Sequence, residues 1–125
     1  MRSLFDALSR LPRRGRLALY ALACLILLYL TLAPGKDVPG VGLVWDKAEH
    51  AISWAVLTGA GLLLSTKRRW AILLFAFVFG AAIEVLQATL PFGRDGDILD
   101  LTADTVGIAV AYAVWLIWRR LGWVK

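Results

Sequence analysis

Two neighbouring segments decide the fold: GAAIEVLQ at Gly80–Gln87 and DLTADTVG at Asp100–Gly107, separated by turn-forming residues at Pro91–Asp97. Both segments are mostly apolar, yet each contains carboxylates. Glu84 lies inside a run that is otherwise suited to lipid, and Asp104 lies near the start of another. An ionisable side chain at membrane depth costs at least ~2.5 kcal/mol on insertion scales. These carboxylates therefore mark a candidate functional site.

The composition predicts an all-α membrane protein. Hydrophobic residues make up 60% of the 125-residue chain, whereas soluble domains average about 45–50%. The excess is concentrated in four blocks, each close to the ~20 residues that a helix needs to cross a ~30 Å hydrocarbon layer. The blocks are residues 17–33, 48–64, 70–90 and 101–118. We therefore expect a four-helix transmembrane bundle whose spans and loops leave no room for a soluble domain.

The basic residues predict the orientation of this bundle. Eleven of the fourteen Lys and Arg residues lie in segment 1–16, in the loop 65–69 or in segment 119–125. With four spans these three segments share one side, which the positive-inside rule places in the cytoplasm. The net charge of +5 thus has a membrane explanation, and nucleic acid is not an expected partner. We expect a basic N-terminal segment at 1–16, a membrane domain at 17–118 and a basic tail at 119–125, with both termini cytoplasmic.

Two further features are expected at the membrane surfaces. Residues 3–9 are expected to form a short interfacial turn of helix. Five tryptophans near the predicted span ends are expected to form an aromatic belt. They are Trp45, Trp70, Trp115, Trp118 and Trp123.

Polar residues gather at one end of three predicted helices. At about 100° per residue, one face of each helix carries them: Asp46, Lys47, Glu49, His50 and Ser53 on the second; Gly80, Glu84 and Gln87 on the third; Asp100, Asp104, Gly107 and Ala111 on the fourth. The second and fourth helices begin at the outer side of the membrane, and the third ends there. Because lipid offers polar groups no partners, we expect these faces to enclose a shared cavity that opens outward. Arg94 can fold over its carboxylates, because a guanidinium suits bidentate pairing.

Nine residues are candidates for ligand binding: Asp46, Lys47, His50, Glu84, Gln87, Arg94, Asp97, Asp100 and Asp104. Catalysis would fall to His50, Glu84 or Asp100. A metal would be held by His50, Glu84, Asp100 and Asp104, which offer one nitrogen and three oxygens to a divalent cation. The same residues also allow a self-satisfied network: Arg94 with Asp97 or Asp100, Lys47 with Glu84, and His50 with Asp46. Asp97 and Asp100 would then only cap the fourth helix and complement its dipole.

The order and spacing of these residues resemble the pattern of the VanZ-like family of small bacterial multispanning membrane proteins. The matching residues are Asp46-Lys47-x-x-His50, Glu84-x-x-Gln87 and Arg94-x-x-Asp97-x-x-Asp100-x-x-x-Asp104-x-x-Gly107. The family is named for a protein linked to resistance to teicoplanin-type glycopeptide antibiotics. The resemblance therefore implies a cell-envelope role in the bacterial cytoplasmic (inner) membrane. The family usually has Asn where this chain has Asp104, and the additional carboxylate favours cation binding.

Three functions remain open from the sequence. The first is binding or modification of an anionic envelope lipid, such as a lipid-linked cell-wall precursor, with basic side chains on phosphate and carboxylates orienting donors or holding a cation. The second is a metal-dependent intramembrane hydrolase or transferase, in which a cation activates water. The single histidine and the absence of an HExxH motif count against it. The third is a non-catalytic membrane scaffold whose polar network fixes helix packing.

Overall fold

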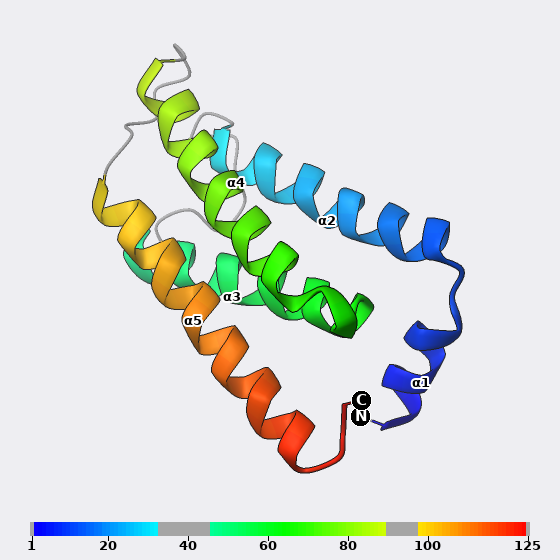
Figure 1. The fold of residues 1–125 in the computed structure, drawn as a ribbon. Helices are drawn as coiled ribbons and strands as arrows, with labels where there is room; N and C mark the ends of the chain where they lie inside the picture. The colour runs from blue at the N-terminus through cyan, green and yellow to red at the C-terminus, as the bar shows by residue number, and fades with distance from the viewer. Residues whose placement is uncertain (1, 33–45, 90–97, 125) are drawn as a thin grey trace.

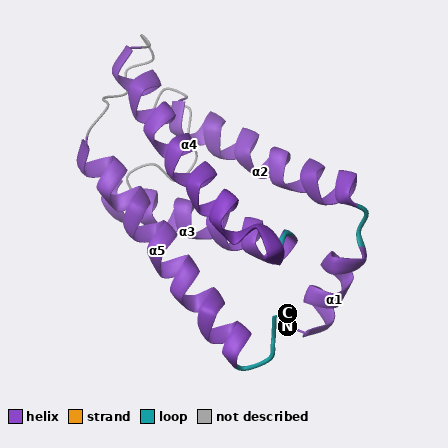
Figure 2. Ribbon diagram, viewed as in Figure 1, coloured by secondary structure: helices purple, strands orange, loops and turns teal. Residues whose placement is uncertain are grey.

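The computed structural model describes residues 2–32, 46–89 and 98–124, and every regular element in these ranges is helical (Figures 1 and 2). The elements are α1 (Arg2–Arg10), α2 (Arg13–Leu32), α3 (Asp46–Leu64), the 3₁₀ helix η2 (Thr66–Arg68), α4 (Arg69–Thr89) and α5 (Ile98–Arg120). The all-α prediction is confirmed for these residues. Each predicted apolar block coincides with one long helix, although residues 33 and 90 lie outside the described ranges.

Three of the described helices, α2, α4 and α5, are long and apolar enough to cross a membrane. Their outward faces carry exposed large apolar side chains such as Leu25, Leu74 and Val110, a distribution typical of a surface that faces lipid. The fourth predicted span, α3, is not among these three helices, and its first turns carry the polar run Asp46–His50. The prediction of four spans is thus supported for three helices.

The core forms around α3, which packs most extensively against α5 and also contacts α1, α2 and α4. One glycine makes the close approach of α3 and α5 geometrically feasible. A Cβ atom placed on Gly107 would lie only 2.1 Å from the backbone oxygen of Ala51, so a side chain at this position would collide with α3. Small residues at helix interfaces allow such close packing in membrane proteins.

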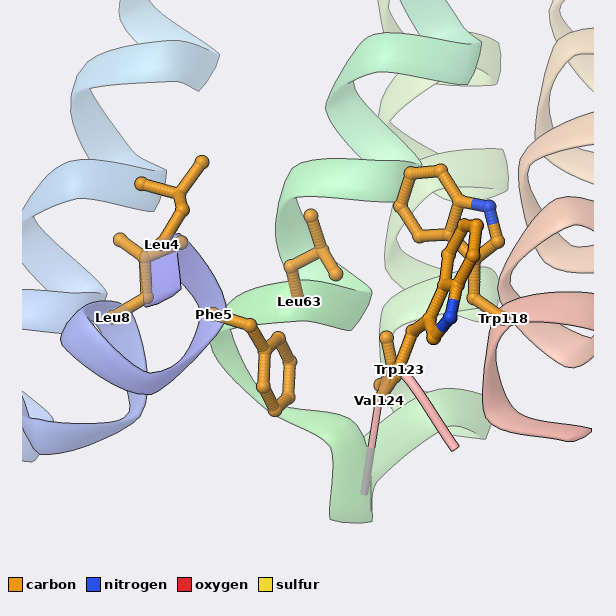
Figure 3. Close-up of a pocket in the computed structure, with 7 residues that line it drawn as sticks. All are labelled: Leu4, Phe5, Leu8, Leu63, Trp118, Trp123 and Val124. Carbon is orange, nitrogen blue, oxygen red and sulfur yellow. The ribbon is translucent and has the colours of Figure 1, made fainter. Parts of the chain in front are cut away.

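A second apolar cluster ties α1 to the C-terminus. It comprises Phe5, Leu62, Ile72, Trp115 and Val124. Figure 3 shows the adjoining pocket, with Leu4, Phe5 and Leu8 of α1 on one side, Trp118, Trp123 and Val124 on the other, and Leu63 of α3 between them. The helix expected within residues 3–9 is therefore present as α1, and its apolar side covers the bundle.

The C-terminal segment turns back toward α1 through a glycine cap. Gly122 has φ 71°, a left-handed conformation that few other residues adopt without strain. The amide of Trp123 donates to the carbonyl of Trp118, and that of Gly122 donates to the carbonyl of Arg119. This pair of bonds is the Schellman ending of a helix, and it leaves Val124 buried.

The aromatic belt prediction is wrong for Trp115, which is 2% exposed. Trp115 continues the stripe of Gly107 and Ala111 at a spacing of four residues, and that stripe faces the bundle interior. Trp70 and Trp123 are exposed, as the prediction requires, whereas Trp45 lies outside the described residues.

Candidate functional site

His50 lies at the centre of a buried charged cluster formed by α3, α4 and α5. Its imidazole is buried and stacks against Trp54, with ring centroids 6.0 Å apart. Lys47, His50 and Trp54 lie on one face of α3 because they are separated by three and four residues. This face is turned toward the neighbouring helices, although it begins with charged residues.

Two carboxylates of α5 flank opposite edges of the imidazole. The Nδ1 atom of His50 lies 2.9 Å from Oδ1 of Asp104, a hydrogen bond in which the ring N–H donates. The Nε2 atom lies 3.6 Å from Oδ2 of Asp100. Asp100 also forms an ion pair with Lys47. The one-turn spacing of Asp100 and Asp104 on α5 therefore places one carboxylate near each ring nitrogen.

Glu84 adds a third carboxylate from α4. Its Oε1 lies 4.0 Å from Nδ1 of His50, on the edge of the ring that also contacts Asp104. Gly80, one turn earlier on α4, makes room for the cluster. A Cβ atom placed there would lie 3.0 Å from Oδ2 of Asp104 and 3.0 Å from Nε1 of Trp54. A larger residue at Gly80 would thus press on both side chains.

Trp54 packs against His50 and is not among the predicted site residues. It is fully buried, and its Nε1 donates a 2.9 Å hydrogen bond to the backbone oxygen of Ala76 on α4. The indole therefore fixes α3 against α4 while covering one face of the His50 ring. Its spacing of four residues from His50 is the signal that would have identified it.

Gln87 is buried near the same end of the bundle, but its described hydrogen bond points elsewhere. Its Nε2 donates to the backbone oxygen of Thr31 at 2.6 Å. Thr31 lies in the last turn of α2, so this contact joins α4 to α2. Gln87 therefore helps to hold the helices around the cluster, and no contact to His50 is described for it.

Three ligand atoms of the cluster are arranged as a candidate metal site. His50, Glu84 and Asp104 each offer one atom, and the three atoms lie within 4.8 Å of one another. All three side chains are at least nine-tenths buried. Asp100, the fourth predicted metal ligand, lies outside this group, because it faces the opposite nitrogen of the imidazole.

Three predicted site residues cannot be placed. Arg94 and Asp97 lie outside the described residues, as does the side chain of Asp46 at the start of α3. The pairings that the structure describes, Lys47 with Asp100 and His50 with Asp104, differ from the predicted pairs of Lys47 with Glu84 and His50 with Asp46. The sequence predicts how far along its helix each residue lies. The rotation of each helix about its own axis, which the sequence does not predict, determines which side chains pair.

The donor atoms of the described cluster are of the kind that binds a cation. His50 offers an imidazole nitrogen, and Glu84 and Asp104 offer carboxylate oxygens. Asp, Glu and His are ligands for zinc and other divalent cations. A cation held by these three residues would polarise a bound oxygen.

Comparison with protein-family models assigns the chain to a family. Residues 25–119 match the VanZ/LLP1 family model, a range that covers the end of α2, the whole of α3 and α4, and nearly all of α5. No curated protein and no solved structure matches the chain. The match includes every described residue of the charged cluster, and the apolar helices are those of a membrane protein. The chain belongs to the VanZ/LLP1 family.

Proposed function

We propose that the chain is a multi-pass protein of the bacterial cytoplasmic membrane in which α2, α3, α4 and α5 all cross the bilayer, with both termini in the cytoplasm. The basic-residue asymmetry supports this orientation. Two residues of α3 support a fourth span: Ile52 and Val56, one turn apart, are 58% and 66% exposed. They form an apolar stripe suited to lipid, while the polar face of the same helix is turned toward α4 and α5.

In this orientation the charged cluster lies at the outer end of the bundle, and its function is to bind a divalent cation. Through that cation the protein holds the phosphate of an anionic envelope lipid or lipid-linked cell-wall precursor. The observation that carries this proposal is the convergence of His50, Glu84 and Asp104. Ionisable residues at membrane depth are costly to place and commonly serve function.

The distances within the cluster suit a small cation. Atoms bound 2.0–2.1 Å from zinc at tetrahedral angles lie about 3.3 Å from one another. The Nδ1 atom of His50 is 2.9 Å from Asp104 Oδ1 and 4.0 Å from Glu84 Oε1, so these separations bracket that value. A cation entering between the three atoms would require movements of under about 1 Å along these two separations.

Asp100 and Lys47 supply the support that a metal-binding histidine requires. A metal at Nδ1 leaves the ring proton on Nε2, and metal-ligating histidines almost always donate that proton to a carboxylate, a carbonyl or water. Asp100 Oδ2 lies 3.6 Å from Nε2. Its other oxygen, Oδ1, pairs with Lys47, so the carboxylate is held beside the imidazole. The position of Asp100 is thus explained as an orienting group.

Phosphate is the ligand class that fits the remaining features of the site. Three protein ligands leave coordination positions open, and phosphate oxygens are hard ligands for divalent cations. Lys47 is the most accessible member of the cluster, with 22% of its side chain exposed against 6% for Asp100. It would meet a headgroup before the buried carboxylates do. Sequestering a cell-wall precursor in this way would alter glycopeptide susceptibility.

The open coordination position also supports a second function. A cation held by three protein ligands can carry a water molecule and activate it as a nucleophile. The protein would then be an intramembrane hydrolase or transferase acting on the same class of lipid. Release of a water-soluble headgroup product would distinguish this function from binding alone.

The test uses the full-length protein, purified in detergent, stripped with a chelator and dialysed against Zn²⁺, Mn²⁺ or Mg²⁺. We expect one equivalent of metal by elemental analysis. Glu84→Gln and Asp104→Asn should each lower the affinity at least about tenfold, since even second-shell changes have effects of 10–100-fold. The matched control is Glu49→Gln, which removes a half-buried carboxylate from the same end of α3.

Lipid binding is measured on the same samples with a polyprenyl pyrophosphate. We expect retention of this lipid to fall when the metal is removed and to recover when it is restored. A folded wild-type protein that binds no metal would refute the cation site. Lipid retention that ignores the metal would refute its bridging role. Stable Glu84→Gln and Asp104→Asn variants with wild-type glycopeptide susceptibility would favour the scaffold function instead.

A further inference from the structure

A second polar site lies at the opposite end of the bundle from the charged cluster. There α1, the start of α2, the end of α3, η2 and the start of α4 line an open cavity of about 570 Å³. This volume lies within the range of about 300–1,000 Å³ that is usual for small-molecule sites. The cavity shares no residue with the cluster around His50, so it requires an explanation of its own.

The side chains that line the cavity form a basic part and an apolar part. Four cationic side chains line it, Arg13, Arg16, Lys67 and Arg68, and none of the described lining residues is acidic. The apolar part includes aromatic and aliphatic side chains of α1, α2 and α4: Phe5, Leu17, Tyr20, Ile72 and Phe75. A ligand that contacts all of these groups must combine negative charge with a hydrocarbon portion.

Two lining residues, Arg16 and Tyr20, carry buried donor atoms that favour a ligand with hydrogen-bond acceptors. Arg16 donates from Nη1 to the backbone oxygen of Leu64 at 2.9 Å, which ties α2 to the end of α3. Its Nε and the hydroxyl oxygen of Tyr20 are buried, and neither has a hydrogen-bond partner among the described residues. A buried donor without an acceptor is destabilising. An oxygen-rich group that entered this wall would therefore stabilise the protein.

We propose that this cavity binds an anionic phospholipid, with the phosphate among the four basic side chains and an acyl chain along the apolar wall. In the proposed membrane orientation the site opens at the cytoplasmic leaflet, where basic pockets between helices bind anionic headgroups. Guanidinium groups suit phosphate because their planar donors match its oxygens. Basic residues that only obey the positive-inside rule need not line a common cavity, and this difference makes the proposal testable.

The experiment uses the full-length protein in detergent, delipidated and then titrated with phosphatidylglycerol or phosphatidylcholine of identical acyl chains, with bound lipid counted by native mass spectrometry. We expect phosphatidylglycerol to bind more tightly. Arg13→Gln combined with Lys67→Gln should weaken it about 25-fold, since each basic residue near an anionic surface contributes about 1 kcal/mol, or about fivefold. The matched control is Arg14→Gln with Arg120→Gln, which removes two charges outside the cavity. It should change the affinity by less than about twofold, because neither side chain lines the cavity and exposed charges outside it are screened by solvent and salt.

A third variant tests the apolar wall without changing charge. Ala71 lines the cavity and is exposed, so Ala71→Phe places a ring in the cavity without displacing a buried side chain. We expect this variant to lose phosphatidylglycerol binding at an unchanged melting temperature of the lipid-free protein. Equal weakening by the two double variants, or wild-type affinity in Ala71→Phe, would overturn the proposal. Inorganic phosphate that binds as tightly as phosphatidylglycerol would also overturn it, because the acyl chain would then contribute nothing to the affinity.

Loss at this site is distinguishable from loss at the charged cluster. Removal of divalent metal, and Glu84→Gln, should leave phosphatidylglycerol bound at the basic cavity with wild-type affinity. If Glu84→Gln weakened phosphatidylglycerol binding as much as polyprenyl pyrophosphate binding, the two lipids would be binding at one site. That result would overturn the inference of a second site.

Discussion

Replacing Gly107 by Ala should separate α3 from α5 and disable the charged cluster from a distance. The new Cβ would lie 2.1 Å from the backbone oxygen of Ala51 and 3.0 Å from the backbone nitrogen of Ala55. Both contacts are with main-chain atoms, so no side chain can rotate away to relieve them. The helices themselves must move.

The size of the movement follows from the geometry. Contacts of Cβ atoms below 3.0 Å are essentially never found, so the Ala51 contact must lengthen by about 0.9 Å. Ala51 follows His50 directly, and Gly107 lies one turn from Asp104. If the shift is transmitted along both helices, the 2.9 Å bond between His50 and Asp104 approaches 3.8 Å and ceases to be a hydrogen bond.

Two energy terms then add. Overpacking costs about 1–3 kcal/mol, and a hydrogen bond to a charged group contributes about 1.5–3 kcal/mol. We expect Gly107→Ala to lower the free energy of unfolding by about 2.5–6 kcal/mol and metal affinity by more than tenfold. The matched control is Gly59→Ala on α3, because a Cβ there meets nothing within 4 Å. That change should stabilise the helix by about 0.5–1 kcal/mol.

The assay is reversible unfolding in mixed micelles, followed by circular dichroism, with metal affinity measured under native conditions. Gly107→Ala with wild-type stability and wild-type metal affinity would show that α3 and α5 are not in the described contact. Equal destabilisation by Gly59→Ala would indicate a general intolerance of α3 and α5 to added methyl groups, and the argument from the Ala51 contact would fail.

Three further predictions concern the cluster and the topology. Trp54→Phe removes the hydrogen bond to Ala76 but keeps a ring beside His50, so unfolding in micelles should show a loss of about 1–2 kcal/mol with metal still bound. Asp100→Asn should lower metal affinity 10–100-fold by calorimetry while keeping one-to-one stoichiometry, as expected for an orienting group; loss of stoichiometry would make Asp100 a ligand. Reporter fusions at residues 35 and 93 should be active outside and fusions at 67 and the C-terminus inside, and an outside C-terminus would refute the topology.

The sequence predicts the helices well because the signal is local. Each long helix corresponds to one apolar block, and the blocks are bounded by turn residues or charges that cannot continue into lipid. The grouping of His50, Glu84 and Asp104 at one end of the bundle follows from alternating helix directions. These inferences need only the position of a residue along its helix.

Other features depend on how the helices are rotated about their axes, and one sequence does not determine that rotation. From the sequence, Lys47 could pair with any of several carboxylates at the same end of the bundle. The structure pairs it with Asp100, since α3 and α5 pack closely at Ala51 and Gly107. The same packing buries Trp115. The basic cavity was also not predicted, because its lining combines residues of α1, α2, α3, η2 and α4 that are far apart in the sequence.

The energetics of the cluster support the proposal that its charges serve binding more than packing. Replacing a buried ion pair by apolar residues of similar volume is often neutral or stabilising by about 1–4 kcal/mol, so helix packing alone gives no reason to retain one. Here the apolar contacts of Trp54, Leu57 and Ile83 already join the helices directly beneath the cluster. A scaffold needs fixed helices, which those contacts and Gly107 provide. A cation site additionally needs ligand atoms that converge and a group that orients the histidine. Around His50, the carboxylates of Glu84 and Asp104 lie near Nδ1, and the carboxylate of Asp100 lies near Nε2.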